Sequence, residues 1–179
     1  MVLAAMAAAA ALFSFPGGQA VSAAPLLPAA PASSPRPRPG LWTLAMAECR
    51  FNLRAELDRW PDCADPVQMG QTALSRPSPG QPGSALKYVY AEGDPGLLQV
   101  ETGRGGAEAW SYYGFRPLAS DADGEVIRAR IWPVTCPPRG CRLKTAKELL
   151  AAARASEARA FTEAAEDPGR TAVWVRRAQ

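Results

Sequence analysis

Short segments in which apolar and polar residues alternate constrain this chain more than any other feature. In the clearest, residues 127–132, Ile127, Ala129 and Ile131 are separated by arginines and followed by a tryptophan. A period of two predicts a half-buried β-strand, here with its arginine side toward water. Similar segments recur between turn sequences, at residues 41–48, 67–74, 86–90, 98–101, 110–115 and 171–177. Together they predict a mainly β fold, either an antiparallel meander or a partly open β-barrel.

Two turn sequences join neighbouring strands of this set. Residues 92–96 predict a hairpin between the third and fourth recurring segments, and residues 121–124 predict a second turn. Asp121, Asp123 and Glu125 also resemble part of a calcium loop, but the distal bidentate glutamate is absent at the required spacing. Because Asp-Gly is a common hairpin turn, the turn is the favoured interpretation.

Two segments have helical rather than alternating spacing. Leu53, Leu57 and Trp60 follow an asparagine N-cap, which predicts a two-turn helix that ends at Pro61. A second helix begins at the Thr-x-x-Glu capping box of residues 145–148 and carries a thin, alanine-rich apolar stripe. We therefore expect one short helix near the first strand and one C-terminal helix before the last strand.

The chain has four cysteines, Cys49, Cys63, Cys136 and Cys141. An even number in an exported chain predicts disulfides, and of the three possible pairings we favour the local one, Cys49 with Cys63 and Cys136 with Cys141. Zinc is the competing interpretation, but only the second pair comes near the usual ligand spacing. A redox role for that pair is disfavoured because four residues, not two, separate its cysteines.

The N-terminal region predicts export. The first charged residue is Arg36, and an apolar, alanine-rich run is followed by small residues, as in a signal peptide. We expect a signal peptide over residues 1–23 cleaved after Ala23, a Pro/Ala-rich linker over 24–39, and one β-rich domain over 40–179. An uncleaved anchor or tail is the alternative. The expected location is periplasmic or secreted, with no transmembrane span after cleavage.

Composition excludes several chemistries. The chain contains no histidine, which removes Ser-His-Asp and Cys-His catalysis and histidine-ligated metal sites. Oxidised cysteines would not serve as nucleophiles, so we predict no catalytic residue, no metal and no cofactor. The net charge of +3 is spread without a basic run, so we expect no nucleic-acid partner. We expect a monomer.

An aromatic set marks the candidate binding residues. Its members are Tyr88, Tyr90, Trp110, Tyr112 and Tyr113. They could line a ligand pocket, although a domain of this size needs most of its aromatics for its core, which is the favoured interpretation. The expected partner is an unknown apolar ligand or an envelope protein, bound by a non-enzymatic domain.

The alternative function is a carboxylate-dependent hydrolase acting on envelope polysaccharide. Its candidate residues are Asp58, Asp62, Asp65 and Asp94. Paired carboxylates about 5 to 9 Å apart can cleave glycosides, whereas such residues more often cap helices or solvate loops. The hypothesis requires two of them to converge in one cleft beside Trp60 or Tyr90.

The two ends of the predicted domain resemble the lipocalin and calycin superfamily. In that superfamily a Gly-x-Trp motif opens the first strand and an arginine near the end of the barrel packs over the tryptophan. Gly40 and Trp42 match the motif, and Arg176 or Arg177 could supply the arginine. The sequence departs from the pattern in predicting seven strands rather than eight. Its Pro-Gly-Leu-Trp opening also resembles small periplasmic bacterial proteins of unknown function.

Overall fold

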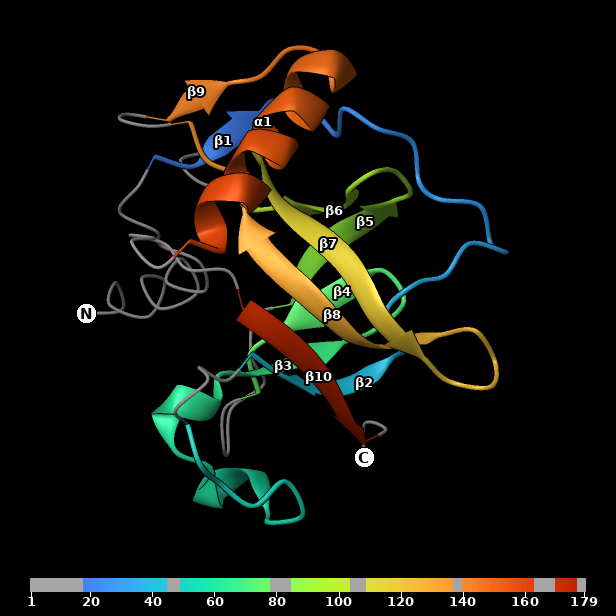
Figure 1. The fold of residues 1–179 in the computed structure, drawn as a ribbon, viewed down its shortest axis with the longest axis vertical. Helices are drawn as coiled ribbons and strands as arrows, with labels where there is room; N and C mark the ends of the chain where they lie inside the picture. Colours follow the sequence, from blue (N-terminus) through green and yellow to red (C-terminus); the bar gives the residue numbers. More distant parts are fainter. Residues whose placement is uncertain are drawn as a thin grey trace, which may run out of the picture.

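The structure is a computed structural model that describes residues 18–44, 49–77, 85–103, 109–136, 140–162 and 170–176. Within these ranges lie one α-helix, α1 (Ala146–Ala160), and two 3₁₀ turns, η2 (Leu57–Arg59) and η3 (Asp62–Ala64) (Figure 1). The strands are β1 (Ala20–Ser22), β2 (Gly40–Thr43), β3 (Pro66–Met69), β4 (Ala73–Ser75), β5 (Leu86–Ala91), β6 (Gly96–Glu101), β7 (Trp110–Ser120), β8 (Val126–Pro133), β9 (Cys141–Arg142) and β10 (Arg170–Arg176).

Eight of these strands form a closed antiparallel barrel. From β2 to β8 each barrel strand pairs with the next in sequence, and β10 pairs with both β8 and β2 to complete the ring. The predicted mainly β antiparallel fold is thus confirmed, and the barrel is closed rather than partly open. The predicted last strand and the 92–96 and 121–124 turns are also present.

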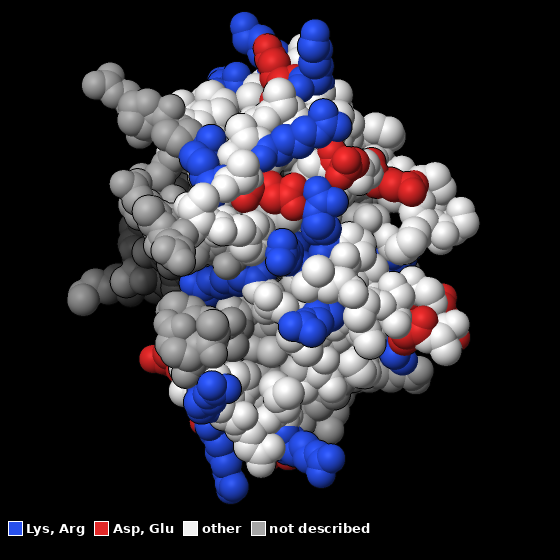
Figure 2. Space-filling view, viewed as in Figure 1, with Lys and Arg blue, Asp and Glu red and all other residues white. Residues whose placement is uncertain are grey.

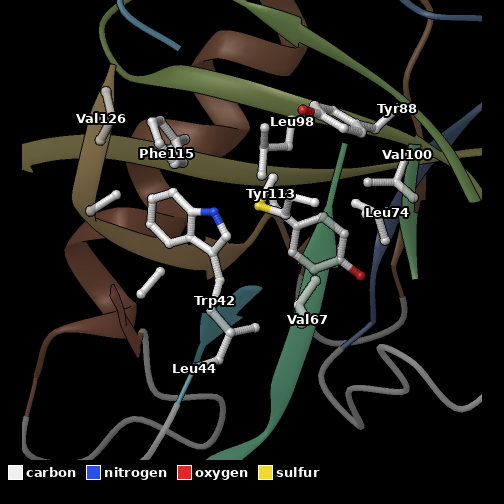
Figure 3. Packing of buried hydrophobic residues seen from close by; sticks show 13 residues of the cluster. Trp42, Leu44, Val67, Leu74, Tyr88, Leu98, Val100, Tyr113, Phe115 and Val126 are labelled. Carbon is white, nitrogen blue, oxygen red and sulfur yellow. The ribbon is translucent and has the colours of Figure 1, made fainter. Parts of the chain in front are cut away.

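The interior of the barrel is filled by side chains (Figure 3). Trp42 and Phe115 are almost completely buried there, together with Tyr88 and Tyr113. Alternate positions of each strand point inward, as the period of two requires, and an eight-stranded barrel is just wide enough for side chains to fill it. The barrel is therefore a packed core.

Strand register defines the two ends of the barrel. Gly40 is opposite Met69, beside the turn from β3 to β4, whereas Thr43 is opposite Pro66 at the other end. We call the first end the mouth; it carries the β3–β4, β5–β6 and β7–β8 turns and the start of β2. The disulfide-bonded segment of residues 49–63 lies beside the start of β3, away from the mouth.

Helix α1 covers the outer face of β7 and β8. Its N-terminus has the predicted capping box, in which Glu148 N donates to the Thr145 side chain. Trp132 on β8 donates its indole N–H to Ala153 O at 3.1 Å, and its ring lies directly over Gly114 on β7. A glycine there leaves room for the indole, so the Gly114–Trp132 pair determines how closely the helix approaches the sheet.

Residues 18–39 run along the outside of the barrel to the mouth, and we call them the strap (Figure 1). The strap begins with β1, which pairs with β7 and β9. Farther on, the buried Gln99 side chain accepts from Leu26 N and Leu27 N and donates to Leu27 O. The two leucines pack on a second buried cluster, which lies on the outer face of the sheet beneath the strap and α1 and which we call the outer core. The composition predicts a linker here, whereas the structure packs these residues against the sheet and the single Gln99 amide binds three of their backbone groups.

Two secondary-structure predictions are wrong. The helix expected over residues 53–60 is replaced by η2 and η3, since so short a helix is marginal without a buried face and Leu53 is exposed. The strand expected over 67–74 is two strands, β3 and β4, joined by a tight turn in which Gly70 N donates to Ala73 O. That turn raises the barrel from seven strands to eight.

Both predicted disulfides are confirmed, Cys49 with Cys63 and Cys136 with Cys141. The first closes a loop of 14 residues' separation, for which the loop-entropy model predicts a stabilisation of about 3 kcal/mol. No helix in the described ranges is long and apolar enough to cross a membrane.

The contact between Gly114 and Trp132 can be tested by adding one methyl group. A Cβ on residue 114 would lie 2.0 Å from the Trp132 ring, so Gly114→Ala must displace the indole and the helix above it. We expect the free energy of unfolding in urea to fall by about 1 to 3 kcal/mol. In a Trp132→Leu background the same substitution should cost much less, and an equal cost in both backgrounds would refute this explanation.

The contacts of β1 imply that the folded domain begins before Ala24. Cleavage after Ala23 would remove β1 and leave β9 without its partner strand. It would also remove the hydrogen bond between the Ser22 hydroxyl and the buried Tyr112 hydroxyl. A chain that begins at Ala24 should therefore be less stable in urea than one that begins at Gly18, by about 2 kcal/mol or more. Equal stability of the two chains would show that β1 is dispensable.

Candidate functional site

The structure divides the predicted aromatic set between the two faces of the sheet. Trp110 and Tyr112 point outward and are buried in the outer core, beneath the strap and α1. Tyr113 points into the barrel and is also buried. Tyr88 and Tyr90, on the inner face of β5, lie together near the mouth. Only these two of the five line a cavity identified at the mouth.

The two tyrosines form one wall of a small cavity. Tyr88 donates its hydroxyl to Gly70 O at 2.8 Å, which fixes its ring beside the β3–β4 turn. Tyr90 packs edge to face on Phe115, with ring centroids 5.5 Å apart. The cavity has a volume of about 180 Å³. Besides the tyrosines, its polar lining consists of Arg36, Gln71, Thr72 and Glu125.

A second, more open cavity of about 360 Å³ adjoins the first and shares Pro39 and Glu125 with it. Its other lining side chains include Arg38, Gln68, Met69 and Asp123. The two cavities together form a groove across the mouth, which we call the mouth groove. One wall is the strap, and the other consists of Tyr88 and Tyr90 on β5 together with the β3–β4 and β7–β8 turns.

Arg38 fixes the strap where it crosses the mouth. Its guanidinium lies 4.4 Å from the centre of the Trp174 ring and pairs with the carboxylate of Asp121. Its carbonyl accepts the indole N–H of Trp42 at 2.8 Å. Arg38, which precedes the first barrel strand, thus lies over Trp174. The lipocalin resemblance predicts a different contact, an arginine from the end of the chain over Trp42, and this stays a prediction. The side chains of Arg176 and Arg177 lie outside the described residues.

The phenols of the mouth groove are neutral at physiological pH. Burial raises the pKa of Tyr88 to about 12, and the nearby Arg36 charge offsets this only in part. Burial and the negative charge of Glu92 raise the pKa of Tyr90, again against Arg36. Both hydroxyls therefore remain protonated and can donate or accept hydrogen bonds, while the charged groups of the first cavity are Arg36 and Glu125.

The carboxylates of the hydrolase hypothesis lie on three different parts of the fold. Asp65 pairs with Arg170 and Arg76 at the end away from the mouth. Asp58 and Asp62 are exposed on η2 and η3. Asp94 lies on the β5–β6 turn and contacts Arg116, on the far side of the closed sheet from β2. Asp94 therefore lies on a different turn from the other three carboxylates.

Asp121, Asp123 and Glu125 form the predicted hairpin turn. The Asp121 carboxylate accepts from the backbone N–H groups of residues 123 and 125, each at 3.0 Å, and also pairs with Arg38. In the part of the chain that the structure describes, no group of three or more acidic residues or cysteines is arranged to hold a metal ion.

Sequence reasoning missed most of the polar lining of the mouth groove. Gln71, Thr72 and Glu125 come from turns, and Arg36 comes from the strap. Arg36 and Glu125 lie outside the alternating segments, and Gln71 and Thr72 lie within residues 67–74, which were predicted as one continuous strand. No family model matches the sequence, and no curated protein or solved structure is significantly similar to it.

The raised pKa of Tyr88 makes a prediction for alkaline pH. The Tyr88 phenol loses its proton near pH 10 in the unfolded chain and only near pH 12 in the folded protein. Its contribution to the free energy of unfolding is therefore complete below pH 10 and is lost as the pH rises to 12. The loss should be about 2 to 3 kcal/mol. Tyrosinate absorbance of the native protein should show this late titration, and Tyr88→Phe should reduce its amplitude, while Tyr90 and Tyr112, whose pKa values burial also raises, still contribute. A native titration complete near pH 10 would contradict the burial of this phenol.

Proposed function

We propose that this protein is an exported, non-enzymatic binding domain that takes a small ligand in the mouth groove. One observation carries the proposal: Tyr88, Tyr90 and Arg36 line a cavity at the mouth of a barrel whose interior is already filled. An aromatic wall with a few convergent polar groups is typical of small-molecule sites. The packed interior argues against a ligand held inside the barrel.

Export is supported by two features. Both cysteine pairs are disulfide-bonded, and disulfides persist mainly in oxidising compartments such as the periplasm or the cell exterior. The apolar, uncharged N-terminal run is typical of a secretory signal. A bacterial envelope location, periplasmic or secreted, is therefore part of the proposal. The closed barrel is compatible with the lipocalin resemblance and does not establish it.

The lining of the mouth groove favours a ligand with both an aromatic face and an anionic group. Tyrosine rings offer apolar contact surface, and Arg36 offers a guanidinium that pairs well with carboxylate, sulfonate or phosphate oxygens. The lining of the groove is partly polar, so the ligand is amphiphilic rather than purely apolar. Glu125 on the opposite wall can accept a hydrogen bond from the same molecule.

Anilinonaphthalene sulfonate is a suitable probe because it combines an aromatic system with a sulfonate. We expect saturable fluorescence enhancement with the native protein at neutral pH. Arg36→Gln should weaken the affinity about tenfold, since it removes a charge-assisted hydrogen bond. Arg50→Gln is the matched control, because this exposed arginine lies in the disulfide-bonded region, and it should leave the affinity unchanged.

A Tyr90→Phe variant separates the hydroxyl from the ring. Because the phenylalanine keeps the contact with Phe115, the fold should be retained and any change in affinity should report the hydroxyl. No enhancement with the native protein, or equal affinity for the native protein and Arg36→Gln, would refute the mouth groove as the site.

A further inference from the structure

The outer face of β7 and β8 carries arginines that the barrel does not neutralise. Figure 2 shows Lys and Arg gathered in a band across this face, below α1. Arg128 and Arg130 are both exposed on β8. Arg130 is directly opposite Arg116 on β7, and Arg128 is opposite Ala119. Like charges directly opposite on neighbouring strands destabilise a sheet, so their presence needs a reason.

Only one arginine of the facing pair has a carboxylate partner. Arg116 binds both carboxylate oxygens of Glu157, at 2.5 and 2.8 Å, and contacts Asp94 at 3.1 Å. Arg130 instead stacks on Phe161, 4.9 Å from the ring centre. Among the described residues, neither Arg128 nor Arg130 forms an ion pair with an acidic side chain. Two guanidinium charges on this face therefore remain available to a partner.

Exposed apolar side chains flank these charges. Leu118 on β7 is 45% exposed beside the bulge opposite Arg128, and Phe161 at the end of α1 is 38% exposed beneath Arg130. They are two of the three large hydrophobic side chains that are exposed in the described ranges. A surface that alternates Leu or Phe with arginine matches the headgroup region of an anionic bilayer, where the cations pair with phosphates and the apolar side chains enter the interface.

We infer that this face, defined by Arg128, Arg130, Leu118 and Phe161, binds the surface of a membrane that contains anionic lipid. Charge complementarity selects an anionic partner, and the convex outer wall of a barrel fits a broad surface better than it fits a peptide in a groove. The contact is peripheral and sensitive to salt, because it depends on two exposed cations and two partly exposed apolar side chains. This inference does not depend on the mouth groove.

Vesicle sedimentation with the full chain tests this inference. The full chain should sediment with phosphatidylcholine vesicles that contain phosphatidylglycerol more than with pure phosphatidylcholine, and the difference should shrink as salt is added. Arg128→Gln and Arg130→Gln should each lower the partition coefficient about fivefold. Arg54→Gln is the matched control, since Arg54 is an exposed arginine in the disulfide-bonded segment. It should change the partition little.

A Leu118→Ser variant tests the apolar contribution to vesicle binding. It should weaken binding while leaving the salt dependence of binding unchanged. Every variant keeps the apolar N-terminal run, so differences between variants report the β7–β8 face. The inference fails if anionic vesicles have no advantage, or if Arg54→Gln weakens binding as much as Arg128→Gln does. Equally strong, Arg128-dependent binding to soluble polyglutamate would also overturn it, in favour of an acidic macromolecule.

Discussion

The pairing of Trp42 with Trp174 is the constraint on which the rest of the structure depends. The two residues are directly opposite on β2 and β10, the strands whose pairing closes the barrel between its first and last segments. Trp42 donates its indole N–H to Arg38 O and Trp174 donates to Pro39 O, so the two rings bind consecutive carbonyls. Closure therefore also fixes the strap at the mouth, and without it the mouth groove would lack one wall.

The alternation of apolar and polar residues predicted the longer strands, because each of them has one face in a core. It could not predict how many strands there are, since β3 and β4 lie within one continuous apolar-polar segment. Val67, Met69 and Leu74 are all buried, and the turn at Gly70 that separates them contains no proline or Asp-Gly signal. The strap was missed for a different reason. Its fixed conformation depends on Gln99, which lies more than seventy residues away in sequence, so local composition carried no information about it.

Part of the site could have been predicted more sharply. Tyr112 and Tyr113 are consecutive in a strand and must point to opposite faces, so they could never line one pocket together. Tyr88 and Tyr90 are two residues apart and share a face, and the structure brings them together near the mouth. Arg36 and Gln71 could not be predicted in the same way, because the path of the strap and a turn, not a strand period, places them there.

Side chains from every barrel strand occupy the interior. The cavity that Tyr88 and Tyr90 line therefore lies at an end of the barrel, where turns and the strap supply side chains that the core does not need. The strap connects the outer core to the mouth of the barrel. Its first strand is buried between β7 and β9, while its last residues line the mouth groove. Loss of β1 would leave Leu26 and Leu27 as the next attachment of the strap to the outer core, so the position of the N-terminus influences how rigidly the groove is built.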